Sequence, residues 1–354
     1  MRTILVTGGA GFIGSNFIRF LMKRSPYYQV VNLDKLTYAG NPANLKQVEN
    51  WKHYHFIQGD ICCRELVEDI FQEFSVDCLV NFAAETHVDR SIITPEVFIQ
   101  TNVLGTVNLL NTAKRHWEKT PQSISDKKFI QISTDEVYGS LGKEGYFTET
   151  TPLDPHSPYA ASKAAADLLA KSYFDTYGLP VNITRCSNNY GPYQFPEKLI
   201  PLVITNALHK RDIPVYGDGL NVRDWLYVED HCAAIALVMQ KGKAGEIYNI
   251  GGHQEKTNLQ LIKTILTYLH DNVDSSITEN LIKYVEDRKG HDRRYGIDPT
   301  KIHAELGWSA KILLDTGIEK TIRWYLDHEE WTRDLIAQGS PQLDLESHGS
   351  GDGL

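Results

Sequence analysis

Short apolar runs alternate with longer amphipathic segments through the first half of the chain. The apolar runs include TILVT, YQVVNL, DCLVNFA and KKFIQIST, which are rich in Val, Ile and Leu. Between them, SNFIRFLMKR, RELVEDIFQEF and a stretch near residues 95–118 carry apolar residues at helical spacing. This alternation predicts a parallel sheet with crossover helices, and strands this apolar are covered on both faces. We therefore expect an α/β fold built on a doubly wound parallel sheet.

The alternation stops after residue 185, where a stretch dense in Pro, Tyr and Asn begins with CSNNYGPYQFPEKLIPL. A helix near 229–241 and the strand EIYNIG are expected to return the chain to the sheet. Helices near 258–271 and 315–330 are expected in a smaller unit. We predict two interleaved domains: residues 1–185 plus about 229–251 form the first, and residues 186–228 plus about 252–338 form the second. Residues 339–354 contain no Lys or Arg and are rich in Gly, so we expect a disordered tail.

Charge narrows the classes of partner. Thirty-six Lys and Arg stand against 45 Asp and Glu, and the net charge of -9 speaks against a broad nucleic-acid surface. A small anionic ligand remains open, because a local cluster of donors is enough to bind it. The chain has no run of about 18 apolar residues and no secretory signal pattern. We therefore expect a cytoplasmic protein with no membrane and no nucleic-acid partner.

The cysteines do not suggest a metal site. Cys62, Cys63, Cys78, Cys186 and Cys232 show no CxxC spacing and no nearby His pair. We interpret them as reduced core thiols and expect no metal.

A glycine-rich turn follows the first predicted strand. Gly8, Gly11 and Gly14 lie in GGAGFIG between an apolar run and an amphipathic helix, the context that lets a diphosphate approach a helix N-terminus. Asp34 lies 20 residues beyond Gly14, where an acid accepts hydrogen bonds from the adenosine ribose. Because Asp34 would repel a 2′-phosphate, NAD is favoured over NADP in a Rossmann-type domain. A glycine turn of a non-nucleotide fold with a surface Asp is the alternative.

Tyr159 and Lys163 lie four residues apart in SPYAASKAAADLL, so their side chains share one helical face. Ser157 and Pro158 are typical of a helix start. A cation beside a phenol favours the phenolate, and the positive nicotinamide of NAD adds to the effect, so the pKa of Tyr159 can fall toward working pH. Tyr159 could then accept a proton from an alcohol, whereas a solvated Tyr-Lys pair is the structural alternative.

The run KKFIQIS ends in Thr134, Asp135 and Glu136, at the carboxyl edge of the predicted sheet, where doubly wound folds bind ligands. Two carboxylates suggest chemistry in which one acid protonates a leaving hydroxyl and the other removes a carbon-bound proton. Neighbours in an extended strand point apart, so both can act only if the chain turns here. The alternative is a solvated turn with Asp135 as a cap.

Several motifs together carry a family resemblance. TGGAGFIG, AAETHVDRSI, STDEVYG, the YxxxK helix, RCSNNYGP, FPEKLIPL, VRDWLYVED and GHDRRYGID resemble the extended short-chain dehydrogenase/reductase superfamily. Within it the chain closely resembles the dTDP-glucose 4,6-dehydratases of deoxysugar biosynthesis, from the first strand to about residue 331.

The resemblance implies a redox-neutral hydro-lyase in which tightly bound NAD is regenerated at each turnover. Tyr159, helped by Thr134 and Lys163, removes the proton of the glucose 4-hydroxyl as hydride leaves C4. Glu136 takes the C5 proton, Asp135 protonates the departing 6-hydroxyl, and the hydride returns to C6. The product is dTDP-4-dehydro-6-deoxy-glucose, a precursor of rhamnose or of another deoxysugar used in polysaccharide biosynthesis.

The resemblance also implies the binding residues and a homodimer formed through helices of the Rossmann domain. The cofactor contacts are Gly8, Gly11, Phe12, Ile13, Gly14, Asp34, Lys35, Leu36, Thr37, Asp60, Ile61, Phe82, Ala83, Ala84, Thr101, Tyr159, Lys163 and Asn189. The contacts to the nucleotide-sugar substrate, dTDP-glucose, are Thr86, Asn188, Lys198, Leu199, Pro214, Val215, Tyr216, Arg223, Asn258, Arg288, Lys289, Gly290, His291 and Asp292.

Some alternatives remain open. Asp60 taken alone fits a helix cap, and His87 fits either a ligand contact or a hydrogen-bonded core histidine. Family members often carry Pro in place of Lys289 and Ser in place of Thr86, and the role of Lys289 is undecided. A UDP-glucose 4,6-dehydratase, a nucleotide-sugar 4-epimerase or decarboxylase, and a non-catalytic NAD-sensing protein are the rival functions. The epimerase needs no acid to expel the 6-hydroxyl, and the NAD sensor needs no Tyr-Lys pair.

Overall fold

The structure is a computed structural model that describes residues 1–24, 27–119, 124 and 126–337. The tail expected at residues 339–354 lies outside the described residues. Among the described helices, none is both long enough and apolar enough to cross a bilayer.

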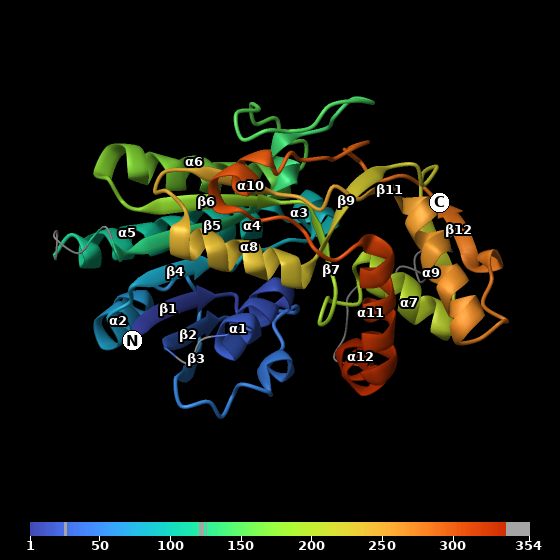
Figure 1. Ribbon diagram of the computed structural model, residues 1–354, viewed down its shortest axis with the longest axis horizontal. Helices are drawn as coiled ribbons and strands as arrows, with labels where there is room; N and C mark the ends of the chain where they lie inside the picture. Colours follow the sequence, from blue (N-terminus) through green and yellow to red (C-terminus); the bar gives the residue numbers. More distant parts are fainter. Residues whose placement is uncertain (25–26, 120–123, 125, 338–354) are drawn as a thin grey trace, which may run out of the picture.

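A seven-stranded parallel sheet forms the larger part of the molecule (Figure 1). In sheet order the strands are β10 (Ile247–Ile250), β6 (Val181–Cys186), β5 (Lys128–Thr134), β4 (Cys78–Asn81), β1 (Arg2–Thr7), β2 (Tyr28–Asp34) and β3 (Tyr54–Gln58). The chain runs from β1 outward to β3 and then from β4 outward on the other side. The strand order therefore reverses between β1 and β4, which confirms the predicted doubly wound fold and locates its topological switch point.

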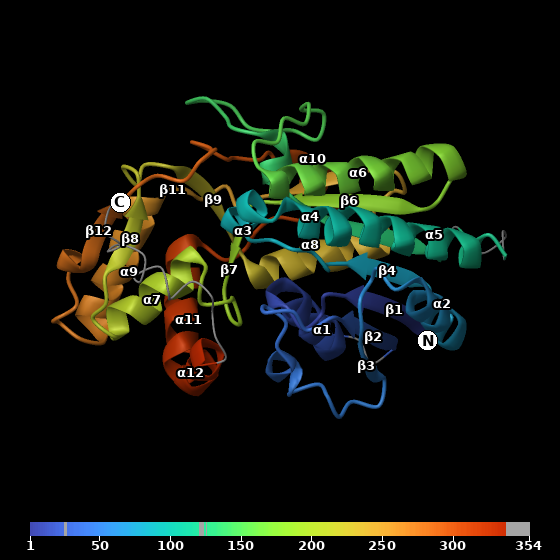
Figure 2. The same ribbon diagram turned by 180° about the vertical axis from the view of Figure 1, so that it is seen from behind.

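Helices cover both faces of this sheet (Figures 1 and 2). Successive side chains of a strand point to opposite faces, so Ile4 and Val6 of β1 pack into one core and Leu5 packs into the other. The first core includes α1 and α8, and the second includes α2, α5 and α6. The helices of this part are α1 (Phe12–Arg24), α2 (Arg64–Phe74), α3 (Val88–Ile93), α4 (Pro95–Phe98), α5 (Thr106–Trp117), α6 (Pro158–Tyr177), α8 (Val228–Lys241) and α10 (Thr300–Leu306).

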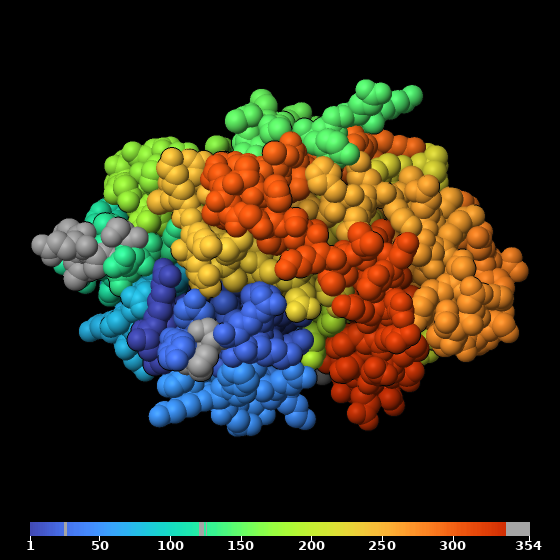
Figure 3. All heavy atoms as spheres, viewed as in Figure 1, coloured from blue at the N-terminus to red at the C-terminus, as the bar shows by residue number. Residues whose placement is uncertain are grey.

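A smaller part with its own apolar core lies beside the carboxyl edge of the sheet. Its strands are β11 (Glu255–Thr257), β9 (Val222–Tyr227) and β7 (Asn188–Tyr190) in one sheet, and β12 (Ile282–Val285) and β8 (Ile213–Tyr216) in another. Its helices are α7 (Leu199–Leu208), α9 (Asn258–Asn272), α11 (Leu314–Asp327) and α12 (Glu329–Ala337). Figure 3 shows the red C-terminal helices beside the blue N-terminal segments, and Trp331 Nε1 donates to Asn44 Oδ1 at 2.9 Å.

The domain division remains a proposal. It is supported by β10, which lies in the large sheet although the chain before and after α8 and β10 belongs to the small part. It is also supported by the separate apolar core of α7, α9 and α11. The helix α10 departs from it, because Ile302 packs into the core of the large part although it lies within residues 252–338.

The helix expected near residues 95–118 is interrupted. A π-helical segment, η2 (Ile99–Gly105), separates α4 from α5. Asn102 in this segment is buried, accepts from the Glu85 amide at 2.8 Å and donates to Ser162 Oγ at 2.8 Å. These contacts anchor the widened turn to α6, and Thr101 lines the cavity described below. Periodicity cannot reveal such a segment, because its cause is a set of distant hydrogen bonds.

The interpretation of the cysteines as core thiols is correct for three of them. Cys78, Cys186 and Cys232 are buried, Cys62 is half-buried and Cys63 is exposed. All five are free thiols. Cys63 precedes α2 at the sheet edge, which is why the interpretation is wrong for it.

Candidate active site

A cavity of about 340 Å³ opens at the carboxyl edge of the large sheet, over the switch point. The ends of β1, β2, β3, β4, β5 and β6 all contribute to it. The predicted residues that line it are Gly8, Gly11, Phe12, Ile13, Gly14, Asp34, Lys35, Thr37, Asp60, Ile61, Phe82, Ala83, Ala84, Thr86, Thr101, Thr134, Asp135, Glu136, Tyr159, Lys163, Asn188, Asn189 and Lys198. Residues from positions 8 to 198 are thus brought together around one space.

The glycine turn fits a diphosphate. Gly8 has a φ of 68°, and a Cβ on Gly14 would lie 2.3 Å from the Gly8 carbonyl oxygen, so neither position admits a side chain. The turn leads directly into α1, whose first turn carries no acidic residue. The unpaired amides at the start of α1 are therefore available to an anion in the cavity.

Asp34 is held rigidly at the end of β2. Its Oδ2 accepts from the Ala10 amide and its Oδ1 from the Leu36 amide, each at 2.8 Å. Burial raises the pKa of Asp34, while these two bonds oppose the rise. Leu36, a predicted cofactor contact, is not among the described lining residues. Its backbone amide instead donates to Asp34. Asp34 faces the cavity with remaining acceptor capacity, as NAD ribose hydroxyls require.

The second predicted acid at this end, Asp60, forms an ion pair with Lys35, whose Nζ lies 2.8 Å from Asp60 Oδ2. Asp60 Oδ1 also accepts from the Cys62 amide at 2.8 Å. The helix α2 begins later, with Cys63 in the N-cap position, so Asp60 is not its N-cap.

The catalytic helix begins as its sequence predicts. Ser157 is the N-cap of α6 and its Oγ accepts from the Ala160 amide at 3.1 Å, while Pro158 is the first helical residue. Tyr159 and Lys163 lie one turn apart on the buried face, with exposed fractions of 7% and 5%. Lys163 Nζ donates to the Ile132 carbonyl at 2.6 Å, which ties α6 to β5.

The groups of the protein shift the pKa of Tyr159 upward, opposite to the expected lowering. Burial raises the pKa of Tyr159 well above its ordinary value, and the Glu136 and Asp135 carboxylates add to the rise. A hydrogen bond with Thr134 opposes it. Burial and the two adjacent acids set the direction among the protein groups, so the lowering expected from Lys163 together with the positive charge of NAD stays a prediction.

The chain turns at the carboxylate pair, as the two-acid hypothesis required. β5 ends at Thr134 and a 3₁₀ turn, η4 (Asp135–Tyr138), follows immediately. Thr134 caps this turn, since its Oγ1 accepts from the Glu136 amide at 3.3 Å. Asp135 and Glu136 therefore both line the cavity, and the predicted alternative of a solvated turn is excluded because Asp135 is 2% exposed.

Charges around the pair give the two acids different environments. Burial raises the pKa of Asp135 well above its usual range, and the carboxylates of Glu136 and Asp224 raise it further. Burial also raises the pKa of Glu136, but the cations of Arg223, Lys198 and Arg288 oppose that rise. Three cations thus favour the carboxylate form of Glu136, whereas burial and two neighbouring carboxylates favour the protonated form of Asp135. Different surroundings of this kind are typical of a pair in which one group acts as an acid and the other as a base.

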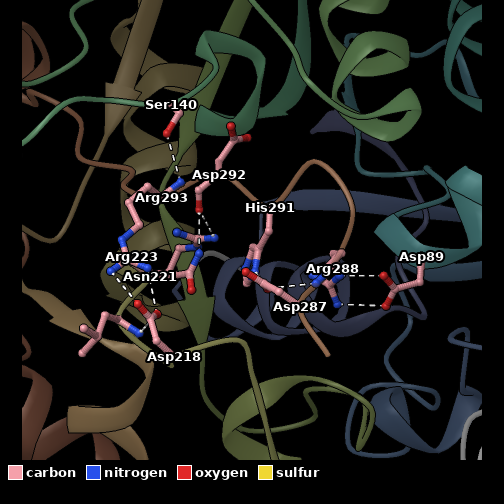
Figure 4. A network of polar contacts seen from close by, with 11 residues as sticks. Asp89, Ser140, Asp218, Asn221, Arg223, Asp287, Arg288, His291, Asp292 and Arg293 are labelled. Atoms are coloured by element: carbon pink, nitrogen blue, oxygen red, sulfur yellow. Dashed lines mark hydrogen bonds and ion pairs between the residues drawn. The ribbon is translucent and has the colours of Figure 1, made fainter. Parts of the chain in front are cut away.

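Most of the other predicted substrate residues are not among the described residues that line the cavity. Figure 4 shows the segment after β12, where Arg288 faces Asp89 of α3 through two contacts of 2.6 and 2.8 Å. The Asp292 carbonyl accepts from Arg223 at 3.0 Å and from Asn221 at 3.1 Å. Outside the described lining lie Leu199 at the start of α7, Pro214, Val215 and Tyr216 in β8, Arg223 in β9, Asn258 at the start of α9, and Arg288, Lys289, Gly290, His291 and Asp292 after β12.

Tyr38 and Glu197 are among the cavity residues that sequence reasoning missed. Tyr38 OH donates to Glu197 Oε1 at 2.9 Å, and both residues line the cavity. His87 Nε2 lies 3.7 Å from Glu197 Oε2, and its Nδ1 accepts from the Arg90 amide at the start of α3. The helix-capping role supports the structural interpretation of His87. Glu197 stands beside Lys198 in FPEKLIPL, and only that proximity could have indicated it.

Comparison with known proteins agrees with this geometry. The model of the GDP-mannose 4,6 dehydratase family matches residues 5–321. A probable dTDP-glucose 4,6-dehydratase of Sinorhizobium fredii is 51% identical over 334 residues, which cover 94% of this chain and 95% of that protein.

Two solved structures are also similar. The dTDP-glucose 4,6-dehydratase of Bacillus anthracis, in complex with NAD, is 50% identical with a TM-score of 0.85, covering 95% of this chain and 100% of that one. The dTDP-glucose 4,6-dehydratase of Streptomyces venezuelae, with NAD and a second ligand bound, is 48% identical with a TM-score of 0.87, covering 94% and 99%. The resemblance inferred from the motifs is confirmed: the chain belongs to the GDP-mannose 4,6 dehydratase family, and the dTDP-glucose 4,6-dehydratases are among its near relatives.

Proposed function

We propose that this protein is a dTDP-glucose 4,6-dehydratase, a hydro-lyase that converts dTDP-glucose to dTDP-4-dehydro-6-deoxy-glucose and water. The observation that carries the proposal is the carboxylate pair. Asp135, whose surroundings favour its protonated form, and Glu136, which three cations favour as a carboxylate, line the same cavity as Tyr159 and Lys163, beside a glycine turn that fits a dinucleotide. The relatives named above support the choice of substrate.

NAD fits the turn side of the cavity and, when bound, supplies the hydride acceptor for sugar C4, the hydride donor for C6 and a positive charge. The amides at the start of α1 would hold its diphosphate, and Asp34 its adenosine ribose. Lys35 and Asp60 close the adenosine end through their ion pair.

The chain's own groups account for the proton transfers. Tyr159 Oη takes the proton of the 4-hydroxyl, with Thr134 as hydrogen-bond partner and Lys163 as the buried cation below it. The 4-keto group acidifies C5, and Glu136 removes the C5 proton. Asp135 gives its proton to the departing 6-hydroxyl, so that water leaves. Glu136 then returns a proton to C5.

The substrate diphosphate calls for cations, and Arg223, Arg288 and Lys198 are the ones that act on Glu136. Guanidinium groups bind phosphate oxygens through parallel donors. The same three residues would then hold the sugar nucleotide and keep Glu136 ionised. A 4-epimerase needs no acid to expel the 6-hydroxyl and so gives no role to Asp135, which is why we place that function second.

The test of this proposal is a substrate comparison. We expect purified protein without added cofactor to convert dTDP-glucose to a keto sugar lighter by one water, seen by mass spectrometry, and to release NAD on denaturation. UDP-glucose should react more slowly. Unchanged dTDP-glucose would refute the proposal, faster turnover of UDP-glucose would favour the UDP-glucose dehydratase, and a galactose product would favour the epimerase.

We further propose that two copies associate through α3, α4, η2 and α6, which lie side by side (Figure 2). Large apolar side chains project from these helices. They are Ile92, Ile93, Val97, Ile99, Leu104 and Leu168, with exposed fractions of 40% to 78%. Exposed apolar side chains on neighbouring helices are a feature of interfaces between chains.

Replacing Ile93 and Leu168 with Asp should therefore yield monomers, because each substitution places a charge in the apolar contact. Light scattering after size-exclusion chromatography measures the mass. Leu313→Asp is the control, since Leu313 is 70% exposed on the other part of the molecule. A wild-type protein of 40.1 kDa in solution would refute the dimer.

We also propose that the enzyme works in the cytoplasm, consistent with its free thiols.

A further inference from the structure

A buried ion pair lies behind the carboxylate turn, outside the groups used so far. Arg185 Nε of β6 donates to Asp167 Oδ2 of α6 at 2.9 Å, and the two side chains are 4% and 1% exposed. Among the described residues, no donor reaches Asp167 Oδ1. A buried charge pair with an unsatisfied oxygen is a weak source of stability, so its presence calls for another explanation.

The pair holds both ends of the turn that carries the two acids. Ser133, the residue before Thr134, donates through Oγ to Asp167 Oδ2 at 2.9 Å. Tyr138, the last residue of η4, accepts at its OH from Arg185 Nη1 at 2.9 Å. The turn is therefore bonded to Asp167 through the residue before it, Ser133, and to Arg185 through its last residue, Tyr138.

The far end of the turn is fixed from a second side. Tyr138 OH donates to Asn249 Oδ1 at 2.8 Å, and its ring stacks on Phe147 with centroids 5.0 Å apart. The hydroxyl of Tyr138 is thus fixed between a donor, Arg185, and an acceptor, Asn249 of β10.

Asp167 also continues the face of α6 that carries Tyr159 and Lys163, at successive intervals of four residues. Lys163 bonds the Ile132 carbonyl and Asp167 bonds the next residue, Ser133. The helix α6 is therefore hydrogen-bonded to two consecutive residues of β5, Ile132 and Ser133, immediately before Thr134.

We propose that the Asp167–Arg185 ion pair is a positioning device that fixes the turn of Asp135 and Glu136 relative to Tyr159 and Lys163. The proposal rests on the dehydratase function argued above. The physical reason is that proton transfer at C5 and O6 must occur on a sugar placed by contacts to Tyr159, so a small shift of the turn removes the acid and the base from reach.

The electrostatics of the pair add a second consequence. Burial lowers the pKa of Lys163, and the carboxylate of Asp167 opposes that fall together with Cys186 of β6. Arg185, Lys163 and Ser133 in turn oppose the rise that burial causes in the pKa of Asp167. Asp167 therefore helps to keep Lys163 charged beneath Tyr159.

Two variants each remove one of the hydrogen bonds between the turn and the ion pair without removing a charge. Ser133→Ala and Tyr138→Phe should each lower kcat for dehydration by about tenfold to 100-fold, with KM changed by less than about twofold. The absorbance of reduced cofactor should rise during turnover, because C4 oxidation at Tyr159 persists while elimination slows. Tyr248→Phe is the matched control, since its buried OH also makes two hydrogen bonds, to Glu305 and the Lys243 amide, away from the turn.

A third variant tests the charge. Asp167→Asn should move the alkaline limb of the pH–rate profile for C4 oxidation to lower pH, because Lys163 loses the carboxylate that favours its charged form. Arg185→Lys should leave that limb in place, since it keeps a cation beside Asp167, which opposes the rise of the Asp167 pKa. A loss of kcat in the two hydrogen-bond variants no larger than in Tyr248→Phe would overturn the proposal, and these variants decide the matter if Asp167→Asn does not fold. Inactive wild-type protein would instead refute the dehydratase function itself.

Discussion

Replacing Asp135 with Asn is expected to slow dehydration by about 10²- to 10⁴-fold while leaving oxidation at C4 in place. Asn keeps the shape of the side chain but has no proton of suitable acidity for the departing 6-hydroxyl. The mixture of variant and dTDP-glucose should therefore show the absorbance of reduced cofactor and little keto sugar. Stopped-flow absorbance and mass spectrometry of the same sample measure the two steps.

The same substitution should raise the unfolding temperature at neutral pH. The pKa of Asp135 is higher in the folded protein than in the unfolded chain, where it is about 3.9. As pH rises above that unfolded pKa, the unfolded chain ionises first, so the folded protein loses stability. Asn removes that loss. Asp230→Asn is the control, because Asp230 is also buried but its Oδ2 accepts from the Lys311 and Ile312 amides, away from the cavity. If Asp135→Asn abolished C4 oxidation as well, the separation of roles between Asp135 and Tyr159 would be wrong.

Replacing Tyr159 with Phe is expected to lower kcat by about 10²- to 10⁴-fold and to remove the reduced-cofactor signal altogether. Phe keeps the buried ring and its edge contact with Phe98, so binding of dTDP-glucose should change little. The proton of the 4-hydroxyl then has no acceptor, and neither oxidation nor elimination can begin. Single-turnover absorbance and equilibrium binding of the sugar nucleotide separate these effects.

Tyr173→Phe on the same helix is the matched control, since its OH donates to Asn111 at 2.8 Å, away from the cavity. Full activity is expected for it. Residual C4 oxidation in Tyr159→Phe close to the wild-type rate would assign the proton transfer to another group, with Glu136 the first candidate because it lines the same cavity. The opposite signatures of Asp135→Asn and Tyr159→Phe make the pair of variants more informative than either alone.

The cofactor part of the site could be predicted from the sequence because its features are local. A glycine at the turn, a helix immediately after it and an acid at the end of the next strand all act through backbone geometry within about 30 residues. The start of α6 was equally local, since Ser157 caps the helix whose next turns carry Tyr159 and Lys163. Such features depend on dihedral angles and helical periodicity, which the sequence specifies directly.

The substrate half depended on contacts between segments far apart in the chain. Arg288 reaches Asp89 across 199 positions, and Tyr38 bonds Glu197 across 159. The π-helical segment around Asn102 was hidden for the same reason, because its partners Glu85 and Ser162 lie in other elements. Motif matching named many of these residues but could not say which ones line the cavity.

By itself, the sequence determined the doubly wound sheet and the place of the cofactor turn, because these follow from apolar periodicity and backbone conformation, and its motifs named the candidate reacting side chains. Only the tertiary structure decided how the surroundings act on the pKa values of the two carboxylates. Those surroundings are burial and the charges of Arg223 and Asp224 on β9 and of Arg288 after β12. A pKa is set by the distances to every neighbouring charge and by loss of water, and neither is defined until the chain has folded.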